Sequence, residues 1–340
     1  MNRVLVEDIK DFVSSFVLAE ELHNATFLVT GGTGLIGSLL IRCLLALNKS
    51  IHVIAPVRNR VKAEALYTEY ASNVKILECD LLTFDYDTVG DVDYIVHCAA
   101  PTASRFFVNH AVETFHCIVQ GTTILLEYAK KHKVKSFVYL SSLEVYGSVN
   151  NESEVITEEQ QGYLNPTSLR SSYPMAKRAV ETLCHLYAKE FHVPAKIARL
   201  TQTTGAGIAR DDNRVIAQFA RLTAEGKDIV LHTTGESARP YCYTMDAISA
   251  ILYILLRGAD GEAYNVANEE TYISAMGMAH FLREEFCPQL DVRVELNDNM
   301  GYAPPTKLRL STDKLQALGW RPQYGLRRIF NQLIEYLKSS

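Results

Sequence analysis

A glycine-rich string between a β-branched run and an apolar helical pattern constrains this chain more than any other feature. The string, TGGTGLIG at residues 30–37, fits G-x-x-G-x-x-G and, one residue later, G-x-G-x-x-G. Glycines at this spacing permit a tight turn, a close approach of the backbone to a pyrophosphate and tight packing of helix on strand. The following helix directs its unpaired N–H groups at the anion. The string therefore predicts a dinucleotide site with contacts from Gly31, Thr33, Gly34, Leu35, Ile36 and Gly37.

Short β-branched runs alternate with longer helical patterns along the first 200 residues. The helical patterns, for example at 35–47, 122–132 and 175–192, supply the crossovers that parallel strands require. This alternation predicts an α/β fold, in which a doubly wound, Rossmann-like parallel sheet is covered by helices on both faces. The predicted strands lie at about 25–30, 51–57, 74–78, 93–98, 135–141 and 195–201.

The pattern changes after about residue 200, so the chain divides into three predicted parts. Residues 1–24 have a helical pattern and form an N-terminal extension, which we expect to serve packing or oligomer formation. Residues 25–200 form the dinucleotide-binding Rossmann domain. Residues 201–340 form a smaller, mostly helical substrate-binding region, with some chain crossing back to the sheet. We expect this region to fold over the carboxyl edge of the sheet, where open α/β sheets bind ligands.

Composition and charge exclude several other classes of protein. Lys and Arg total 34 against 39 Asp and Glu, and the net charge of −5 argues against nucleic-acid binding. No apolar run approaches the roughly 20 residues of a membrane span, and the N-terminus lacks a secretory-signal pattern. The seven cysteines are scattered without a C-x-x-C pair, and none of the ten histidines forms a metal-like pair with an acid. We therefore expect a reduced, cytoplasmic protein without a metal and without a membrane or nucleic-acid partner.

Further cofactor contacts are expected where other strands end. An acid after the second strand would accept hydrogen bonds from both ribose hydroxyls of NAD, but the sequence there is PVRNR, at 56–60. The guanidinium of Arg58 suits a 2′-phosphate, which favours NADP over NAD. The alternative is that Arg58 and Arg60 are solvated loop cations. The other predicted contacts are Asp80 and Leu81 at the adenine, Ala99, Ala100 and Pro101 at the nicotinamide ribose, and Ser141 at the end of the fifth strand.

A serine, a tyrosine and a lysine form the predicted catalytic group. Tyr173 and Lys177 are four residues apart on a predicted helix, so they share one face. An adjacent ammonium and an oxidised nicotinamide would both lower the pKa of the phenol from its usual value of about 10. Such a tyrosine can take a proton from a sugar hydroxyl while hydride leaves the same carbon. Ser142, at the end of the fifth strand, is expected to hydrogen-bond the reacting oxygen.

Together these features resemble the extended short-chain dehydrogenase/reductase family, and within it the NAD(P)-dependent nucleotide-sugar epimerases and dehydratases. The resemblance runs from about residue 25 to the end of the chain. It rests on TGGTGLIG (30–37), DL (80–81), SSLEVYG (141–147), YPMAK (173–177), ARLTQTTGAG (198–207), ESARPYCYTMDAISAI (236–251), EAYNVAN (262–268) and LSTDKLQALGWRP (310–322).

The resemblance implies roles for individual residues. Ser142, Tyr173 and Lys177 match the catalytic triad of the family. Gln202 falls near the expected substrate diphosphate, and Arg239 matches an arginine that usually contacts a phosphate of the nucleotide sugar. The family also implies a homodimer built on two helices of the sheet domain.

The segment around Glu144 narrows the expected chemistry. Glu144 matches the base that the dehydratases and a decarboxylating branch place beside the 4-ketone. Leu143, however, stands where dehydratases of thymidine-diphosphate sugars have a proton-donating aspartate, whereas other branches have a small hydroxyl residue there. Ile118 also departs from the family, which often has asparagine near that position.

The expected activity is oxidation of C4 of a nucleoside-diphosphate sugar, followed by epimerisation or dehydration. One alternative is a net NADP-dependent reductase or dehydrogenase of a keto-sugar or other carbonyl compound. Another is an enzyme like UDP-glucuronate decarboxylase. If Glu144 is only a solvated or capping carboxylate, a simpler epimerase or 4-ketoreductase is expected. A non-catalytic dinucleotide-sensing protein is the alternative from another class.

Overall fold

A seven-stranded parallel sheet forms the centre of the computed structural model, which describes residues 1–102, 104–149, 154–297 and 306–339. The strand order is β11-β7-β5-β4-β1-β2-β3, and each neighbouring pair is parallel. The predicted doubly wound sheet is therefore confirmed. Its strands are β1 (Thr26–Thr30), β2 (His52–Val57), β3 (Val74–Glu78), β4 (Tyr94–His97), β5 (Ser136–Ser142), β7 (Ala195–Leu200) and β11 (Ala263–Val266).

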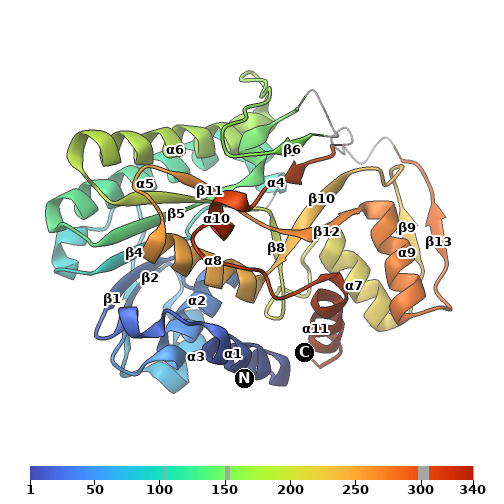
Figure 1. Cartoon of the computed structure of the whole chain (residues 1–340), viewed down its shortest axis with the longest axis horizontal. Helices are drawn as coiled ribbons and strands as arrows, with labels where there is room; N and C mark the ends of the chain where they lie inside the picture. Colours follow the sequence, from blue (N-terminus) through green and yellow to red (C-terminus); the bar gives the residue numbers. More distant parts are fainter. Residues whose placement is uncertain (103, 150–153, 298–305, 340) are drawn as a thin grey trace.

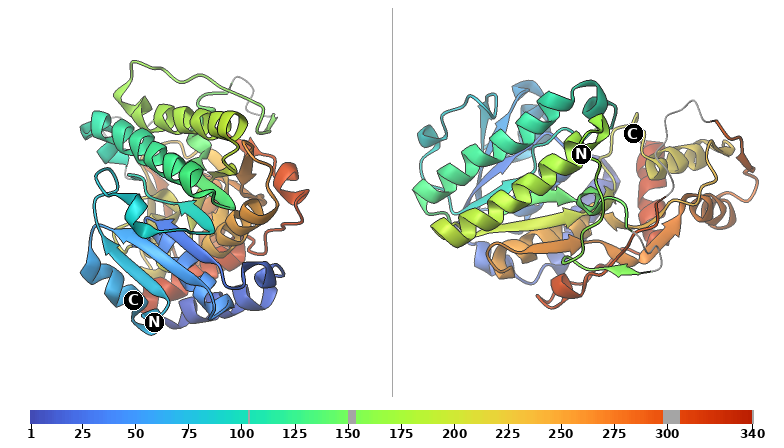
Figure 2. Two further views of the ribbon diagram at one scale, coloured as in Figure 1. Left: turned by 90° about the vertical axis from the view of Figure 1, so that its left-hand side faces the viewer. Right: turned by 90° about the horizontal axis from the view of Figure 1, so that it is seen from above.

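Helices cover both faces of this sheet, as Figure 1 shows. One face packs against α2 (Leu35–Leu47), α3 (Arg60–Tyr67) and α8 (Thr244–Arg257). The other packs against α5 (Ala111–His132) and α6 (Ser172–Phe191), which lie side by side in Figure 2. Successive residues of a strand point to opposite faces. Phe27 and Val29 of β1 accordingly belong to the first core and Leu28 to the second.

A smaller region, on the right of Figure 1, follows β7. It contains a sheet of β8 (Gln202–Thr204), β10 (Ala238–Tyr243) and β12 (Asn268–Ser274), and the pair β9 (Ile229–Leu231) with β13 (Val292–Val294). Helices α7 (Val215–Glu225), α9 (Ala275–Phe286) and α11 (Leu326–Ser339) pack around these strands. Two elements of residues 201–340, β11 and α8, lie instead with the central sheet.

Short elements connect these parts. β6 (Val155–Ile156) pairs with β14 (Arg309–Leu310), and α10 (Asp313–Gln316) follows. Helix α4 (Ser104–Asn109) lies between β4 and α5. Five 3₁₀ turns complete the described elements: η1 (Ala19–Leu22), η2 (Thr68–Tyr70), η3 (Tyr86–Val89), η4 (Leu143–Tyr146) and η5 (Leu169–Ser171).

The N-terminal helix α1 (Arg3–Ser15) packs against α2, α8 and α11. Its buried Asp8 accepts hydrogen bonds from the Tyr243 hydroxyl (2.5 Å) and the Gln332 amide (2.8 Å). The ends of the chain also meet, because the Asn2 side chain donates to the Ser339 hydroxyl at 3.0 Å. Among the described residues, no helix is long and apolar enough to cross a bilayer.

Candidate active site

The glycine-rich turn is held by contacts that only glycine permits. Gly31 has φ +68°, and the amide of Gly34 donates to its carbonyl at 2.9 Å. A Cβ on Gly37 would lie 2.4 Å from the same carbonyl oxygen. Gly34 caps α2 without a side-chain hydrogen bond, so the first N–H groups of the helix remain available to an anion. This cradle fits the pyrophosphate of a dinucleotide.

Other predicted cofactor contacts surround this turn. Arg58 is exposed after β2, with no ion-pair partner among the described residues. Arg60 instead pairs with Glu64 at 3.2 Å and with Glu78 at 3.9 Å. The Arg58 side chain is therefore the one left available for a phosphate.

The residues predicted around the adenine and the ribose lie at the ends of β3 and β4. Asp80 accepts from the Leu82 amide at 2.8 Å and so shapes its own turn. Leu81 packs on α5 where Gly121 leaves room for it. The Ala99 amide donates to the Thr30 hydroxyl at 3.2 Å, next to the glycine turn. The half-buried Ala100 and Pro101 follow directly.

Tyr173 and Lys177 are buried next to each other on the first turns of α6. The ammonium of Lys177 donates to the Leu140 carbonyl at 2.6 Å and lies 5.6 Å from the centre of the Tyr173 ring. Burial lowers the pKa of Lys177 to about 7, against the opposing charge of Glu181. The two side chains therefore share one site, as their spacing predicted.

The pKa of the Tyr173 phenol is raised in the polypeptide itself, and the lowering expected with a bound oxidised nicotinamide stays a prediction. Burial has the largest effect, and the Glu144 carboxylate raises the pKa further. A hydrogen bond with Ser142 and the charge of Arg170 oppose them. Desolvation disfavours the charged form, and together with Glu144 it exceeds the lowering by Ser142 and Arg170.

Two serines at the end of β5 have separate contacts. Ser142 hydrogen-bonds Tyr173 and accepts from the Glu144 amide at 3.2 Å. Ser141 is buried and donates to Glu181 at 2.5 Å, and Glu181 forms an ion pair with Arg199 at 2.7 Å. The Ser141 hydroxyl is thus engaged within the protein, and its backbone belongs to the β5–β7 ladder.

Glu144 lies in η4 with an unpredicted cationic partner. A terminal nitrogen of Arg170, in η5, is 2.8 Å from one carboxylate oxygen of Glu144 and 3.0 Å from the other. Leu143 is buried, so the residue before Glu144 lies in the core. Sequence reasoning missed Arg170, although it stands three residues before Tyr173 in the segment NPTSLRSSY.

An aromatic ring packs on the candidate catalytic tyrosine. Phe107 of α4 is buried and stacks on Tyr173, with ring centres 4.3 Å apart and planes 7° apart. The hydroxyl of Ser172 donates to the Phe107 carbonyl at 3.0 Å. Sequence reasoning also missed Phe107, because nothing in the run RFFVNH distinguishes it from an ordinary core residue.

The predicted substrate residues lie on neighbouring strands of the small sheet. Gln202 begins β8, two residues after Leu200, which pairs in register with Ser142. Its side-chain oxygen is buried without a hydrogen-bond partner among the described residues. Arg239 of the adjacent β10 is half-buried and reaches the Thr306 hydroxyl at 3.4 Å. No hydrogen bond or ion pair joins Arg239 to the Ser142, Tyr173 and Lys177 group within the described part of the chain.

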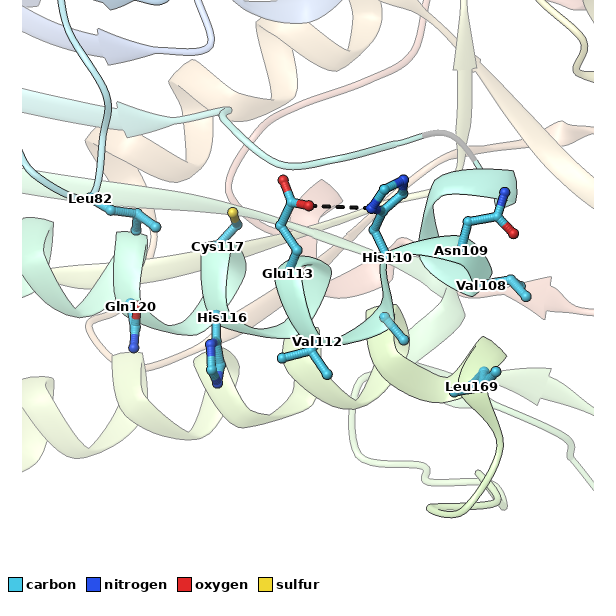
Figure 3. A pocket seen from close by; sticks show the side chains of 11 residues that line it. Leu82, Val108, Asn109, His110, Val112, Glu113, His116, Cys117, Gln120 and Leu169 are labelled. Carbon is cyan, nitrogen blue, oxygen red and sulfur yellow. Dashed lines mark ion pairs between the residues drawn. The ribbon is translucent and has the colours of Figure 1, made fainter.

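A surface hollow of about 760 Å³ lies along the start of α5. In Figure 3, Glu113 and Cys117 lie on one side of the helix, and Val112 and His116 on the other. His110 and Glu113 form an ion pair across 3.5 Å. The lining of this hollow contains none of the predicted site residues. Within the described residues no group of three or more His, Cys, Asp or Glu side chains is arranged to hold a metal ion.

The sequence of this chain is similar to the sequences of known nucleotide-sugar enzymes. The chain is 28% identical to UDP-glucuronic acid decarboxylase 6 of Arabidopsis thaliana over 310 residues, which cover 89% of this chain and 86% of that protein.

Two solved structures share the fold. UDP-glucuronic acid 4-epimerase from Bacillus cereus, in complex with NAD, has a TM-score of 0.75 at 24% identity, covering 92% of this chain and 98% of that one. RMD from Pseudomonas aeruginosa, complexed with NADPH, has a TM-score of 0.74 at 24% identity, covering 93% and 99%.

The model of a single protein family matches most of the chain, from residue 27 to residue 267. That span contains the glycine turn, the Ser142, Tyr173 and Lys177 group, and both predicted substrate residues. The family resemblance inferred from the sequence is therefore confirmed. This chain belongs to the NAD dependent epimerase/dehydratase family.

Proposed function

We propose that this protein oxidises C4 of a nucleoside-diphosphate sugar, epimerises or dehydrates the resulting 4-keto sugar, and then returns the hydride to the sugar. The observation that carries this proposal is the grouping of Tyr173, Ser142, Lys177 and Glu144 at the carboxyl end of β5. Tyr173, Ser142 and Lys177 form the group expected to serve oxidation and reduction at C4. The added carboxylate of Glu144 gives the site a second base, which a simple oxidation or reduction does not need.

Each side chain has a distinct role in this proposal. The nicotinamide, when bound, accepts a hydride from C4 and later returns it. Tyr173 takes the proton of the C4 hydroxyl, and Ser142 hydrogen-bonds the same oxygen. Lys177 places a cationic group next to the phenol. The C4 ketone makes the neighbouring C5–H bond acidic, and Glu144 is the base nearest to that step.

Decarboxylation of a uronic-acid sugar is the second candidate, and two observations favour it over dehydration. Loss of the 6-hydroxyl needs a proton donor, and Leu143 is a buried apolar side chain at the position where an acid would serve. The chain is also similar to a UDP-glucuronic acid decarboxylase along 89% of its length. In that reaction the C5–C6 bond of a 4-keto uronate breaks, CO₂ leaves, and its electron pair becomes an enolate that a proton at C5 then quenches.

An assay of the purified enzyme with UDP-glucuronate and with UDP-glucose tests the proposal. We expect an altered sugar without a stoichiometric change in absorbance of the reduced nicotinamide, because hydride leaves and returns in one cycle. Release of CO₂ from UDP-glucuronate alone identifies the decarboxylase. Stoichiometric consumption of the reduced cofactor would instead establish the reductase alternative and contradict the proposal.

For the cofactor, we propose that NADP is preferred over NAD through Arg58. Solved relatives of this fold hold either NAD or NADPH. The Arg58→Ala variant is expected to weaken NADP binding about tenfold, because a charge-assisted hydrogen bond of about 1.5 kcal/mol is lost. NAD affinity should change less than about twofold.

Arg60→Ala is the matched control, because that guanidinium already pairs with Glu64. Isothermal titration with both dinucleotides measures the difference. If Arg58→Ala weakened the binding of NAD and NADP equally, Arg58 would not contact the 2′-phosphate.

We also propose a homodimer built on the outer face of α5 and α6. Apolar side chains on or next to these helices are exposed there, with Val112 at 71%, Leu169 at 62% and Leu186 at 49%. Large exposed apolar side chains are candidates for burial in a protein interface. Sedimentation of the purified protein as a single chain at micromolar concentration would contradict this arrangement.

A further inference from the structure

Arg170 and Glu144 form an ion pair between two short turns that border Tyr173. Glu144 follows β5 by two residues, and Arg170 precedes Tyr173 by three. One guanidinium nitrogen reaches both carboxylate oxygens, at 2.8 Å and 3.0 Å. The pair therefore ties the turn after β5 to the turn before α6, close enough to Tyr173 for both charges to act on the phenol.

Phe107 holds the guanidinium from another direction. The Arg170 guanidinium carbon lies 5.1 Å from the centre of the Phe107 ring, and that ring stacks on Tyr173 at 4.3 Å. A guanidinium plane packs well on an aromatic face. Arg170 thus has one fixed surface beneath it and one carboxylate beside it, which limits the positions that its head group can adopt.

We propose that Arg170 is a positioning residue of this site, and that it holds the Glu144 carboxylate beside Tyr173. This inference rests on the proposed function for its consequence in catalysis, but not for the contact itself. A freely rotating glutamate on a surface turn would spend most of its time in water. A glutamate held by Arg170 stays next to the sugar carbon that follows C4.

The pKa of the Tyr173 phenol depends on how close the Glu144 carboxylate lies to it. Among the described side chains, the charged or titratable groups that face this phenol are Glu144, Arg170, Tyr139 and Lys177, with Ser142 as its hydrogen-bond partner. α4 contributes the apolar Phe107 ring. Glu144 raises the pKa of Tyr173 in this arrangement. A carboxylate that swings away into water would raise it less.

An ordinary surface ion pair is the competing interpretation. Exposed pairs contribute between about 0 and 1 kcal/mol to stability, and many contribute nothing measurable. The Arg170 and Glu144 side chains are 41% and 33% exposed, so stability alone cannot distinguish the two interpretations. A positioning role requires instead that the effect of Glu144 on Tyr173 depend on Arg170.

A double-mutant cycle on the pKa of Tyr173 tests this dependence. The protein is labelled with tyrosine carrying ¹³C at the hydroxyl-bearing ring carbon, saturated with its oxidised dinucleotide, and titrated by NMR. The Tyr173 signal is assigned by its loss in Tyr173→Phe. With Arg170 present, Glu144→Gln should lower the pKa of Tyr173 by about 0.5 to 1 unit. In the Arg170→Ala background the same change should lower it by less than half as much.

Two further variants distinguish a specific effect of Arg170 on Glu144 from a general loss of folding stability. Arg170→Lys keeps the charge near Glu144 and should restore most of the dependence. Arg257→Ala removes an arginine from a comparable ion pair, with Glu21 just before β1, and should leave the cycle unchanged. In turnover, Arg170→Ala should lower kcat about tenfold with KM changed less than about twofold, because substrate binding does not use the pair.

The outcomes are distinguishable from those of the proposed function. Equal shifts of the Tyr173 pKa in both backgrounds would mean that the two charges act independently, and would overturn the positioning role. No shift from Glu144→Gln in either background would overturn it as well. The NMR titration needs only bound dinucleotide, so it remains decisive even if no nucleotide sugar is a substrate.

Discussion

Replacing Tyr173 by phenylalanine is expected to abolish turnover while leaving the dinucleotide bound. The substitution removes one oxygen from a buried ring and keeps its stacking on Phe107, so the fold should be preserved. Without the phenol, no group hydrogen-bonded to Ser142 remains to take the C4 hydroxyl proton. Loss of a positioned acid–base group typically costs 10²–10⁴-fold, and we expect about a thousandfold loss of kcat.

Tyr187→Phe, on the same helix, is the matched control for this prediction. Its hydroxyl donates to Glu127 on α5, far along the helix from Lys177, so its removal should not affect the chemistry. Dinucleotide binding is measured by fluorescence titration and turnover by the sugar product. Normal turnover in Tyr173→Phe would remove the central residue from the mechanism.

The parts of the fold that depend on local pattern could be predicted from the sequence. The β-branched runs became the strands of the central sheet, and the glycine string became the turn between β1 and α2. Tyr173 and Lys177 share a helix face because their spacing alone determines it. The side chain of Arg58 was left without an ion-pair partner in the described residues, which suits the phosphate contact expected of it.

Contacts between distant turns could not be predicted in this way. Arg170 meets Glu144 across 26 residues, and the position of neither turn follows from periodicity. The hydrogen bond from Tyr243 to Asp8, which holds α1 in place, joins residues that are 235 positions apart in the sequence. β11 completes the central sheet although it follows the small three-stranded sheet's β8 and β10 in sequence. In each case the partners are set by tertiary packing.

The burial of the Tyr173 phenol could not be predicted for a related reason. Sequence spacing shows that a lysine is near, but it does not show how completely the phenol loses water. In the structure Lys177 directs its ammonium at the Leu140 carbonyl, and burial raises the pKa of the phenol. The positive charge of a bound oxidised nicotinamide is therefore expected to be needed to bring Tyr173 to its working pKa.

The Gly37→Ala variant is expected to lose dinucleotide binding. A methyl group at this position would lie 2.4 Å from the Gly31 carbonyl oxygen and 2.9 Å from its carbon, and both atoms belong to the backbone. Neither can rotate away as a side chain would, so the turn itself must shift away from α2. Overpacking of this kind costs about 1–3 kcal/mol of stability. The displaced turn should raise the dinucleotide Kd by about 100-fold, which corresponds to about 2.7 kcal/mol.

Gly325→Ala makes the same chemical change where a Cβ would meet no heavy atom within 4 Å, so it controls for the loss of a glycine as such. Thermal unfolding of both variants, without and with dinucleotide, separates the two effects of Gly37→Ala. A lower midpoint without ligand reports the strained turn. A smaller midpoint rise on adding dinucleotide reports the weakened site, because stabilisation by a ligand grows with the logarithm of its concentration divided by Kd. If Gly37→Ala kept the full rise, the pyrophosphate would have to lie away from the start of α2, and Tyr173 would then face a different part of the cofactor.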